Sequence, residues 1–137
     1  MKLTHTSIMK PKPGMTLLEL TVVILVLLSL ISILFIGARA WKKGSDRSAN
    51  ILNIRNVQQA VRGHANVRGL AEGVALPATD ILGAGKYLNN PVAPNSFITY
   101  TTPAEFVPVA GTLYLAAVYT GTGSADYAPD ATLTAEW

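Results

Sequence analysis

The sequence predicts an α+β protein in which one long N-terminal helix packs against a small antiparallel β-sheet. Three observations support this class. An apolar run extends from Met15 to Ala38, and no proline interrupts the chain between Gly14 and Leu76. Residues 97–120 instead contain short β-like runs separated by turn residues. We therefore expect a long helix, then a connector, then a head.

The apolar run is long enough to cross a membrane. Its 24 residues span about 36 Å as a helix, against roughly 30 Å of bilayer hydrocarbon. Residues 20–36 carry no charge, and these 17 residues exceed the roughly 7 to 15 apolar residues of a secretory signal peptide. We therefore expect residues 15–38 to form a transmembrane segment that is retained.

A secretory cleavage site is the alternative interpretation of this segment. Ala38-Arg39-Ala40 has the small-x-small form that ordinary signal peptidase recognises. Cleavage after Ala40 releases a secreted soluble domain that begins at Trp41. The length of the apolar run favours the transmembrane interpretation.

The second part of the helix, over residues 39–70, is predicted to be amphipathic. At 100° per residue, one side carries Ile54, Val57, Ala60, Val61, His64 and Ala65. The opposite side carries Arg55, Gln59, Arg62 and Asn66. We expect the apolar side to pack against the head and the polar side to face water or a neighbouring molecule.

Residues 71–137 are predicted to form a connector and a small β head. Glycines and prolines crowd residues 71–95, with a short helix near residues 79–82. The middle β-like run is the weakest, because Pro108 cannot donate to a ladder. The simplest arrangement is a three-stranded antiparallel meander that lies on the helix, since so small a sheet needs a partner. The three runs are residues 97–102, 105–109 and 112–120.

One carboxylate, Glu19, lies at the head of the apolar run, in the sequence Gly14-Met15-Thr16-Leu17-Leu18-Glu19-Leu20. A charge at the centre of a bilayer costs about 2.5–3.5 kcal/mol on insertion scales, so an acid within a span is a candidate functional residue. The first 14 residues carry three lysines and no acid. In the simplest alternative, Glu19 sits near the headgroups of an ordinary signal anchor, where the positive helix N-terminus favours it.

The basic leader, the glycine, the sequence from Thr16 to Glu19 and the long apolar helix together resemble the N-terminus of type IV prepilins and type II secretion pseudopilins. The resemblance implies that a membrane peptidase removes residues 1–14 by cutting between Gly14 and Met15, and then methylates the amine of Met15. It also implies that Glu19 meets the N-terminal amine of a neighbouring subunit during assembly, since each buried charge otherwise lacks a partner. This sequence departs from the usual family pattern in two ways: it has Met15 where phenylalanine is more common, and Pro13 before the glycine.

The resemblance further implies a fold, a role and a location. The fold is a ladle-shaped pilin, and the role is that of a structural, non-enzymatic subunit of a pilus-like or pseudopilus filament. The subunit is inserted as a single-pass precursor in the bacterial inner membrane and then enters a periplasmic or cell-surface filament. Its partners are identical or related subunits, the prepilin peptidase and methyltransferase, and the membrane. A pseudopilus, an extracellular pilus and a competence pilus all stay open, as does a major or a minor role.

Charge is unevenly divided beyond the apolar run. Residues 39–68 carry seven basic residues and one acid, whereas residues 69–137 carry one basic residue and six acids. Such a division suits electrostatic contact between identical subunits. A competence-type DNA-uptake pilin that uses Arg55 and Arg62 is the alternative. We expect no specific nucleic acid, because scattered arginines more often form a solvated helix face.

Few residues are suited to catalysis or to binding a cofactor. The chain has no cysteine, which excludes thiol catalysis and thiolate metal sites. His64 lies on the apolar side of the helix and is predicted to be a packing residue. Residues 83–86 lack the rest of a phosphate-binding loop and are predicted to be a turn. Asp126 and Asp130 are sparse for the six to eight oxygens around calcium and are predicted to be solvated acids. We therefore predict no catalytic residue, cofactor or metal site.

Overall fold

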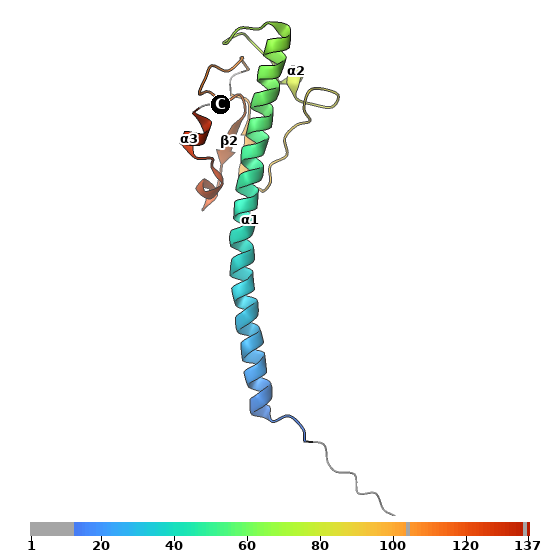
Figure 1. Ribbon diagram of the computed structural model, residues 1–137, viewed down its shortest axis with the longest axis vertical. Coiled ribbons are helices and arrows are strands. Elements are labelled where there is room, and N and C mark those ends of the chain that lie inside the picture. The colour runs from blue at the N-terminus through green and yellow to red at the C-terminus, as the bar shows by residue number, and fades with distance from the viewer. Residues whose placement is uncertain (1–12, 104, 136) are drawn as a thin grey trace, which may run out of the picture. The chain divides into compact units, whose positions relative to one another are not determined.

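The computed structural model describes residues 13–103, 105–135 and 137 (Figure 1). Residues 1–12 of the predicted leader lie outside the described residues. The chain divides into two compact units, the first ending at Ala38 and the second comprising Arg39–Trp137. The elements are the helices α1 (Leu17–Arg68), α2 (Ala78–Ile81) and α3 (Ala131–Thr134), the 3₁₀ helix η1 (Ser124–Tyr127), and the strands β1 (Ile98–Thr101) and β2 (Ala116–Tyr119).

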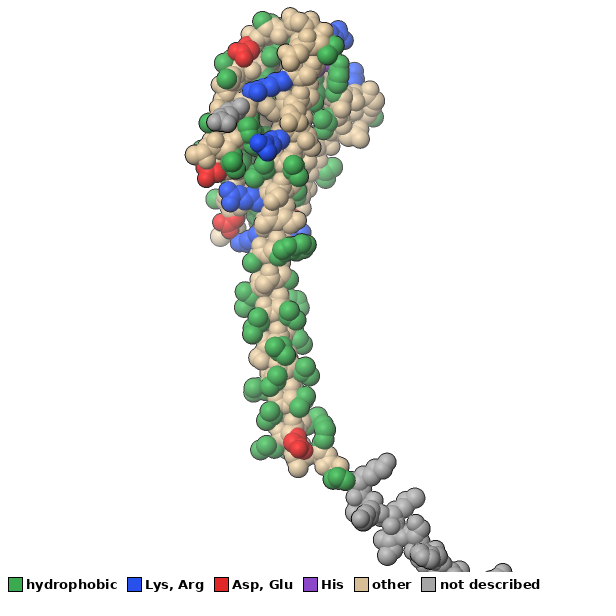
Figure 2. All heavy atoms as spheres, in the orientation of Figure 1, with side chains coloured by type: hydrophobic (Ala, Val, Ile, Leu, Met, Phe, Trp, Pro, Cys, Tyr) green, Lys and Arg blue, Asp and Glu red, His purple; other side chains and the backbone are tan. Residues whose placement is uncertain are grey.

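In the first unit, α1 carries apolar side chains on all sides and buries none of them. Every described residue up to Ala38 is exposed, and Figure 2 shows green apolar side chains along this part of the helix. Within the described part of the chain, α1 is the one helix long and apolar enough to cross a membrane, a property that signal sequences share. The predicted span is therefore helical from Leu17 onward, and its side chains stay uncovered by the part of the chain that the structure describes.

The hydroxyl groups of this apolar segment are satisfied locally. The side chains of Thr21, Ser29 and Ser32 donate to backbone carbonyls about one turn earlier, at 2.9, 2.8 and 2.8 Å. Such bonds let hydroxyls lie in hydrocarbon, because no water is needed to satisfy them. Glu19 is left as the one charged side chain of residues 13–38.

The second half of α1 forms one wall of the hydrophobic core of the second unit. Its predicted apolar side is buried at Ile54, Val57, Val61, His64 and Ala65, and its predicted polar side is exposed. In Figure 1, α2 lies on one side of this part of α1, and β2 and α3 lie on the other. The predicted α+β fold, with a long helix packed against a small antiparallel sheet, is confirmed. The core is completed by Leu76, Ile81, Val107, Tyr114, Leu115 and Trp137.

The sheet has two antiparallel strands, so the predicted three-stranded meander is wrong. β1 pairs with β2 in a register that runs from Ile98 opposite Tyr119 to Thr101 opposite Ala116. The first and third predicted strands are therefore present, but each is shorter than its β-like run.

The predicted middle strand, residues 105–109, pairs with the connector and not with the sheet. The N–H of Val107 donates to the carbonyl of Val74 at 2.8 Å, and the N–H of Gly73 donates to the carbonyl of Val107 at 2.9 Å. A single isolated bridge links the two segments. Pro108, the next residue, faces the opposite edge of this segment, where it has no N–H to offer to another strand.

Gln58, on α1, explains why β2 starts later than predicted. Its side-chain amide donates to the carbonyl of Thr112 at 2.9 Å, and its side-chain oxygen accepts from the N–H of Tyr114 at 3.0 Å. These backbone groups bond to the helix and are not free to pair with a strand. β2 therefore begins at Ala116.

Asn50 makes a second polar contact between α1 and the head. Its side-chain amide donates to the hydroxyl of Tyr119 at 2.8 Å and to the carbonyl of Tyr127 at 3.0 Å, and its oxygen accepts from the hydroxyl of Tyr100 at 3.0 Å. Asn50 is 0% exposed and Gln58 is 3% exposed. Because both amides are hydrogen-bonded, burying them costs little free energy, and their hydrogen bonds fix the position of the head on the helix.

Tyr114 joins the head to the connector. Its hydroxyl donates to the carbonyl of Leu76 at 2.6 Å. Burial, followed by the charges of Glu105 and Asp80, raises the pKa of Tyr114 from 10.0 to about 12. The phenol therefore keeps its proton, and with it this hydrogen bond, at neutral pH.

α1 ends at Arg68, two residues before the predicted end near Leu70. The N–H of Gly69 donates to the carbonyl of Asn66 at 3.3 Å, and the N–H of Leu70 donates to the carbonyl of Ala65 at 2.9 Å. These two bonds form a Schellman motif, which requires a left-handed residue directly after the helix. Gly69 fills that position with a φ of 64°.

Candidate functional site

The candidate site at the head of the apolar helix is formed by Thr16 and Glu19. Glu19 Oε2 accepts from the N–H of Thr16 at 2.9 Å and from its hydroxyl at 3.1 Å, while Thr16 Oγ1 accepts from the N–H of Glu19 at 3.3 Å. This reciprocal arrangement is a capping box, with Thr16 as the N-cap and Glu19 at the third helical position. It starts α1 at Leu17 and places the carboxylate at the positive end of the helix dipole.

Only one of the two carboxylate oxygens of Glu19 accepts hydrogen bonds from the described residues. Both hydrogen bonds from Thr16 go to Oε2, and Oε1 has no partner among the described residues. The side chain is exposed. A donor from outside the chain can therefore approach Oε1 while the cap stays formed. The capping role and a role toward a neighbouring amine are compatible.

Gly14 and Met15 lie in exposed, irregular backbone just before the helix. A Cβ added at Gly14 meets nothing within 4 Å, and the φ of Gly14 is not positive. Folding therefore gives no reason for glycine at this position. The predicted cleavage point between Gly14 and Met15 thus lies in exposed backbone outside α1.

Basic residues follow the apolar part of α1, at the start of the second unit. Lys42 Nζ lies 3.5 Å from Asp46 Oδ1, and Lys43 Nζ lies 2.9 Å from Asp126 Oδ2. The hydrogen bond with Asp126, and then its charge, raises the pKa of Lys43. The same hydrogen bond lowers the pKa of Asp126. Part of the charge division seen in the sequence is thus used for ion pairs within this chain.

Asp130 caps the short helix α3. Its Oδ1 accepts from the N–H of Thr132 at 3.1 Å and from the Thr132 hydroxyl at 3.0 Å, and these hydrogen bonds lower the pKa of Asp130. Asp126 and Asp130 are both exposed, as predicted. One acid thus forms an ion pair and the other caps a helix.

The two arginines of the DNA-binding alternative differ in their surroundings. Both are exposed. The guanidinium of Arg55 lies over the ring of Trp137, 5.1 Å from its centre, and so helps to hold the C-terminal residue. Figure 2 shows Lys and Arg side chains on one face of the second unit, with acidic side chains among them.

The cleavage point of the secretory alternative lies inside a helix. Ala38, Arg39 and Ala40 belong to the continuous helix α1, which runs on past Trp41 to Arg68. Proteases prefer exposed loop tips and segments with little hydrogen-bonded backbone. The helix around Ala40 therefore has to unwind before the peptide bond after Ala40 can be cut.

His64 is buried on the apolar side of α1, as its helical phase predicted. Its ring lies edge-on to that of Tyr87, with the ring centres 5.0 Å apart. Residues 83–86 form the predicted turn, in which the N–H of Lys86 donates to the carbonyl of Gly83 at 3.2 Å.

Three polar residues with clear structural roles were not found by sequence reasoning. The Thr16-x-x-Glu19 spacing ahead of an apolar run is the signature of a capping box, so Thr16 was recognisable. Asn50 and Gln58 lie four residues before and after Ile54, which places both on the apolar side of α1. Their positions in the helix therefore predict that both amides are buried and that each has hydrogen-bond partners.

Comparison with protein-family models, with curated proteins and with solved structures finds no match to this chain. The structure by itself shows an α+β protein with a 52-residue N-terminal helix and a two-stranded antiparallel sheet. The first half of the helix is apolar and exposed, which is consistent with a pilin-like subunit.

Proposed function

We propose that this protein is a structural subunit of a type IV pilus-like or type II secretion pseudopilus filament. A membrane peptidase removes residues 1–14, the amine of Met15 is methylated, and subunits polymerise through the apolar half of α1. One observation supports the proposal most strongly. The apolar helix, with a single carboxylate at its head, packs against none of the described residues.

An exposed apolar helix of this length needs a covering. Monomeric soluble proteins rarely expose contiguous apolar patches larger than a few hundred Å². Here large apolar side chains are exposed along the whole segment from Leu17 to Ile36. A bilayer covers them before assembly, and the same helices of neighbouring subunits cover them in the filament. A pilin-like subunit uses both environments in turn.

Glu19 supplies the register of that assembly. In a bundle of apolar helices, an unpaired carboxylate is costly, and so is an unpaired N-terminal amine. Both costs fall only where the carboxylate of one subunit meets the amine of the next. Oε1 of Glu19 is the free acceptor for this contact, because Oε2 is held by the cap. A subunit displaced along the bundle leaves both charges unpaired.

Replacing Gly14 by alanine is expected to block leader removal and leave the fold unchanged. A Cβ at position 14 meets open space, so a loss of cleavage reports on recognition by the peptidase. The measurement is the mass of the membrane-bound protein, which should stay that of the uncut precursor.

Gly63→Ala is the matched control for this variant, because its added Cβ also meets nothing within 4 Å. Gly63 lies in α1 far from the cleavage point, so the leader of Gly63→Ala should be removed normally. Normal cleavage of Gly14→Ala would argue against a prepilin-type leader.

A further inference from the structure

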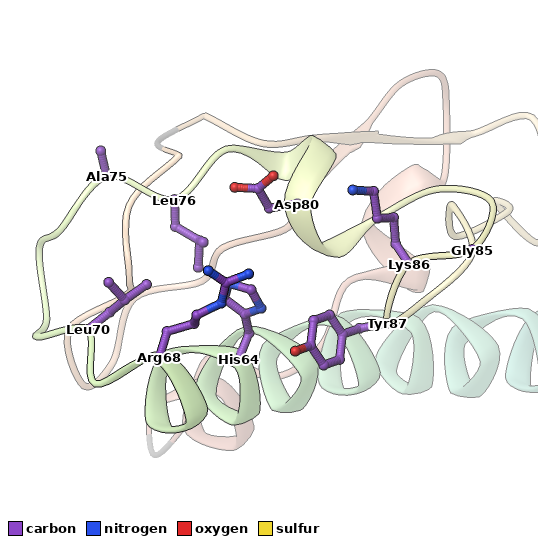
Figure 3. Close-up of a pocket in the computed structure, with 9 residues that line it drawn as sticks. All are labelled: His64, Arg68, Leu70, Ala75, Leu76, Asp80, Gly85, Lys86 and Tyr87. Carbon is purple, nitrogen blue, oxygen red and sulfur yellow. The ribbon is translucent and has the colours of Figure 1, made fainter.

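A cavity of about 850 Å³ opens on the second unit, beside the C-terminal end of α1 (Figure 3). His64 and Arg68 reach it from α1, Asp80 from α2, and Lys86 and Tyr87 from the loop that follows. Its volume falls within the roughly 300–1,000 Å³ that is typical of small-molecule sites. All five side chains belong to the second unit, so the cavity is independent of the apolar segment.

Three charged side chains line the cavity without pairing. In Figure 3, Arg68, Asp80 and Lys86 point into the same hollow. The two ion pairs found among the described residues lie elsewhere, at Lys42 and at Lys43. Two cations and one carboxylate leave a net charge of +1 in the wall. A ligand with a single negative charge therefore balances the site.

His64 lies in the same wall, where most of its surface is covered. Its side chain is 5% exposed, and Nδ1 is the one buried side-chain nitrogen or oxygen among the described residues that has no hydrogen-bond partner. Such atoms are rare in native proteins. Because Nδ1 is itself buried, His64 serves here as a reporter in the wall and not as a direct ligand contact. The buried amides of Asn50 and Gln58, by contrast, are both hydrogen-bonded. The neighbouring ring of Tyr87 is 56% exposed and forms the outer wall beside the imidazole.

We propose that this cavity binds a small ligand that carries one carboxylate together with hydroxyl groups, as acidic sugars and hydroxy acids do. Arg68 and Lys86 donate to the carboxylate, since charge-assisted hydrogen bonds to guanidinium and ammonium groups are the strongest available here. The Asp80 carboxylate accepts from the hydroxyls, and the His64 ring lies in the wall beside them. A dianionic phosphate fits less well, because Asp80 repels its second charge.

The test is a titration of the full-length chain in detergent micelles with glucuronate, at constant ionic strength. The readout is the imidazole signal of His64 in ¹H–¹³C NMR spectra. The chain has two histidines, so a His5→Gln background leaves His64 as the only signal of this type. Glucose serves as the neutral control, lactate as the hydroxy acid, and inorganic phosphate as the competing anion.

We expect glucuronate to shift the His64 signal saturably and glucose to leave it unchanged. Arg68→Gln and Lys86→Gln should each weaken binding by roughly fivefold or more, because each removes a charge-assisted donor. Arg62→Gln removes an exposed arginine of the same helix that does not line the cavity, and it should bind as wild type. Tighter binding of glucuronate than of lactate identifies the ligand as a sugar acid, and equal binding identifies a hydroxy acid.

Three results would overturn the proposal. One is a shift that does not saturate. Another is equal or tighter binding of inorganic phosphate, which would assign the cavity to a different anion. The third is unchanged affinity in both Arg68→Gln and Lys86→Gln. Both side chains are exposed, so neither substitution is expected to unfold the protein.

Discussion

Glu19→Gln is expected to insert into the membrane and lose its leader normally, but to assemble into filaments more than roughly tenfold less than the wild type. The reason is the cost of about 3–5 kcal/mol for removing one partner of a buried charge pair, which leaves the other charge uncompensated. Glutamine keeps a side-chain oxygen that can accept from Thr16, so the capping box is retained. The measurement is the amount of sheared or sedimented filament per amount of processed protein.

Two companion variants separate the charge from the cap. Glu19→Ala removes both and should assemble as poorly as Glu19→Gln. Thr16→Val removes the hydroxyl that caps the Glu19 N–H and keeps the charge, so it should cost about 1 kcal/mol of helix stability and still assemble. Normal filaments from Glu19→Gln, together with a loss of filaments in Thr16→Val, would show that Glu19 acts only as a cap.

Gln58→Ala is expected to lower the free energy of unfolding of the second unit by about 2–4 kcal/mol. The substitution leaves the carbonyl of Thr112 and the N–H of Tyr114 without their partner, and an unsatisfied buried group costs about 1–3 kcal/mol. The measurement is urea unfolding of the full chain in detergent, followed by near-ultraviolet circular dichroism of the head tyrosines.

The adjacent residue provides the matched control for that measurement. Gln59 carries the same side chain one position along α1, but its side chain is exposed. Gln59→Ala should therefore change the unfolding free energy by no more than about 0.5 kcal/mol. Equal unfolding midpoints for the two variants would contradict the assigned role of Gln58.

The helical part of this fold follows directly from sequence periodicity. The apolar run and the apolar side of α1 are local patterns, and both the long helix and its buried face at Ile54, Val57 and Val61 were predicted. The predicted end near Leu70 lies two residues beyond the observed end at Arg68, because the left-handed conformation of Gly69 stops the helix.

The strand pairing depended on contacts that no local pattern contains. Residues 105–109 were the weakest of the three predicted strands because of Pro108, but nothing local in the sequence shows that Val107 bonds to the connector. Gln58 takes the backbone groups of Thr112 and Tyr114, which shortens β2. Both outcomes depend on residues distant in sequence, so alternation alone could not decide between them.

The two candidate sites also differ in whether their residues lie close together in the sequence. Glu19 was recognisable because its carboxylate, the glycine before it and the apolar run lie within a few residues of one another. The cavity beside His64 brings together α1, α2 and a loop. Arg68, Asp80 and Lys86 are unremarkable charges in the sequence, and they form a site only once the connector has folded back against the helix.

Intact-mass and N-terminal analysis of the protein from native membranes tests the proposed filament role most directly, because each interpretation has a different first residue. We predict a chain that starts at Met15 and carries one added methyl group on its amine. A chain that starts at Trp41 would contradict the proposal and leave a secreted domain. An intact Met1 would contradict it as well and leave an ordinary membrane anchor.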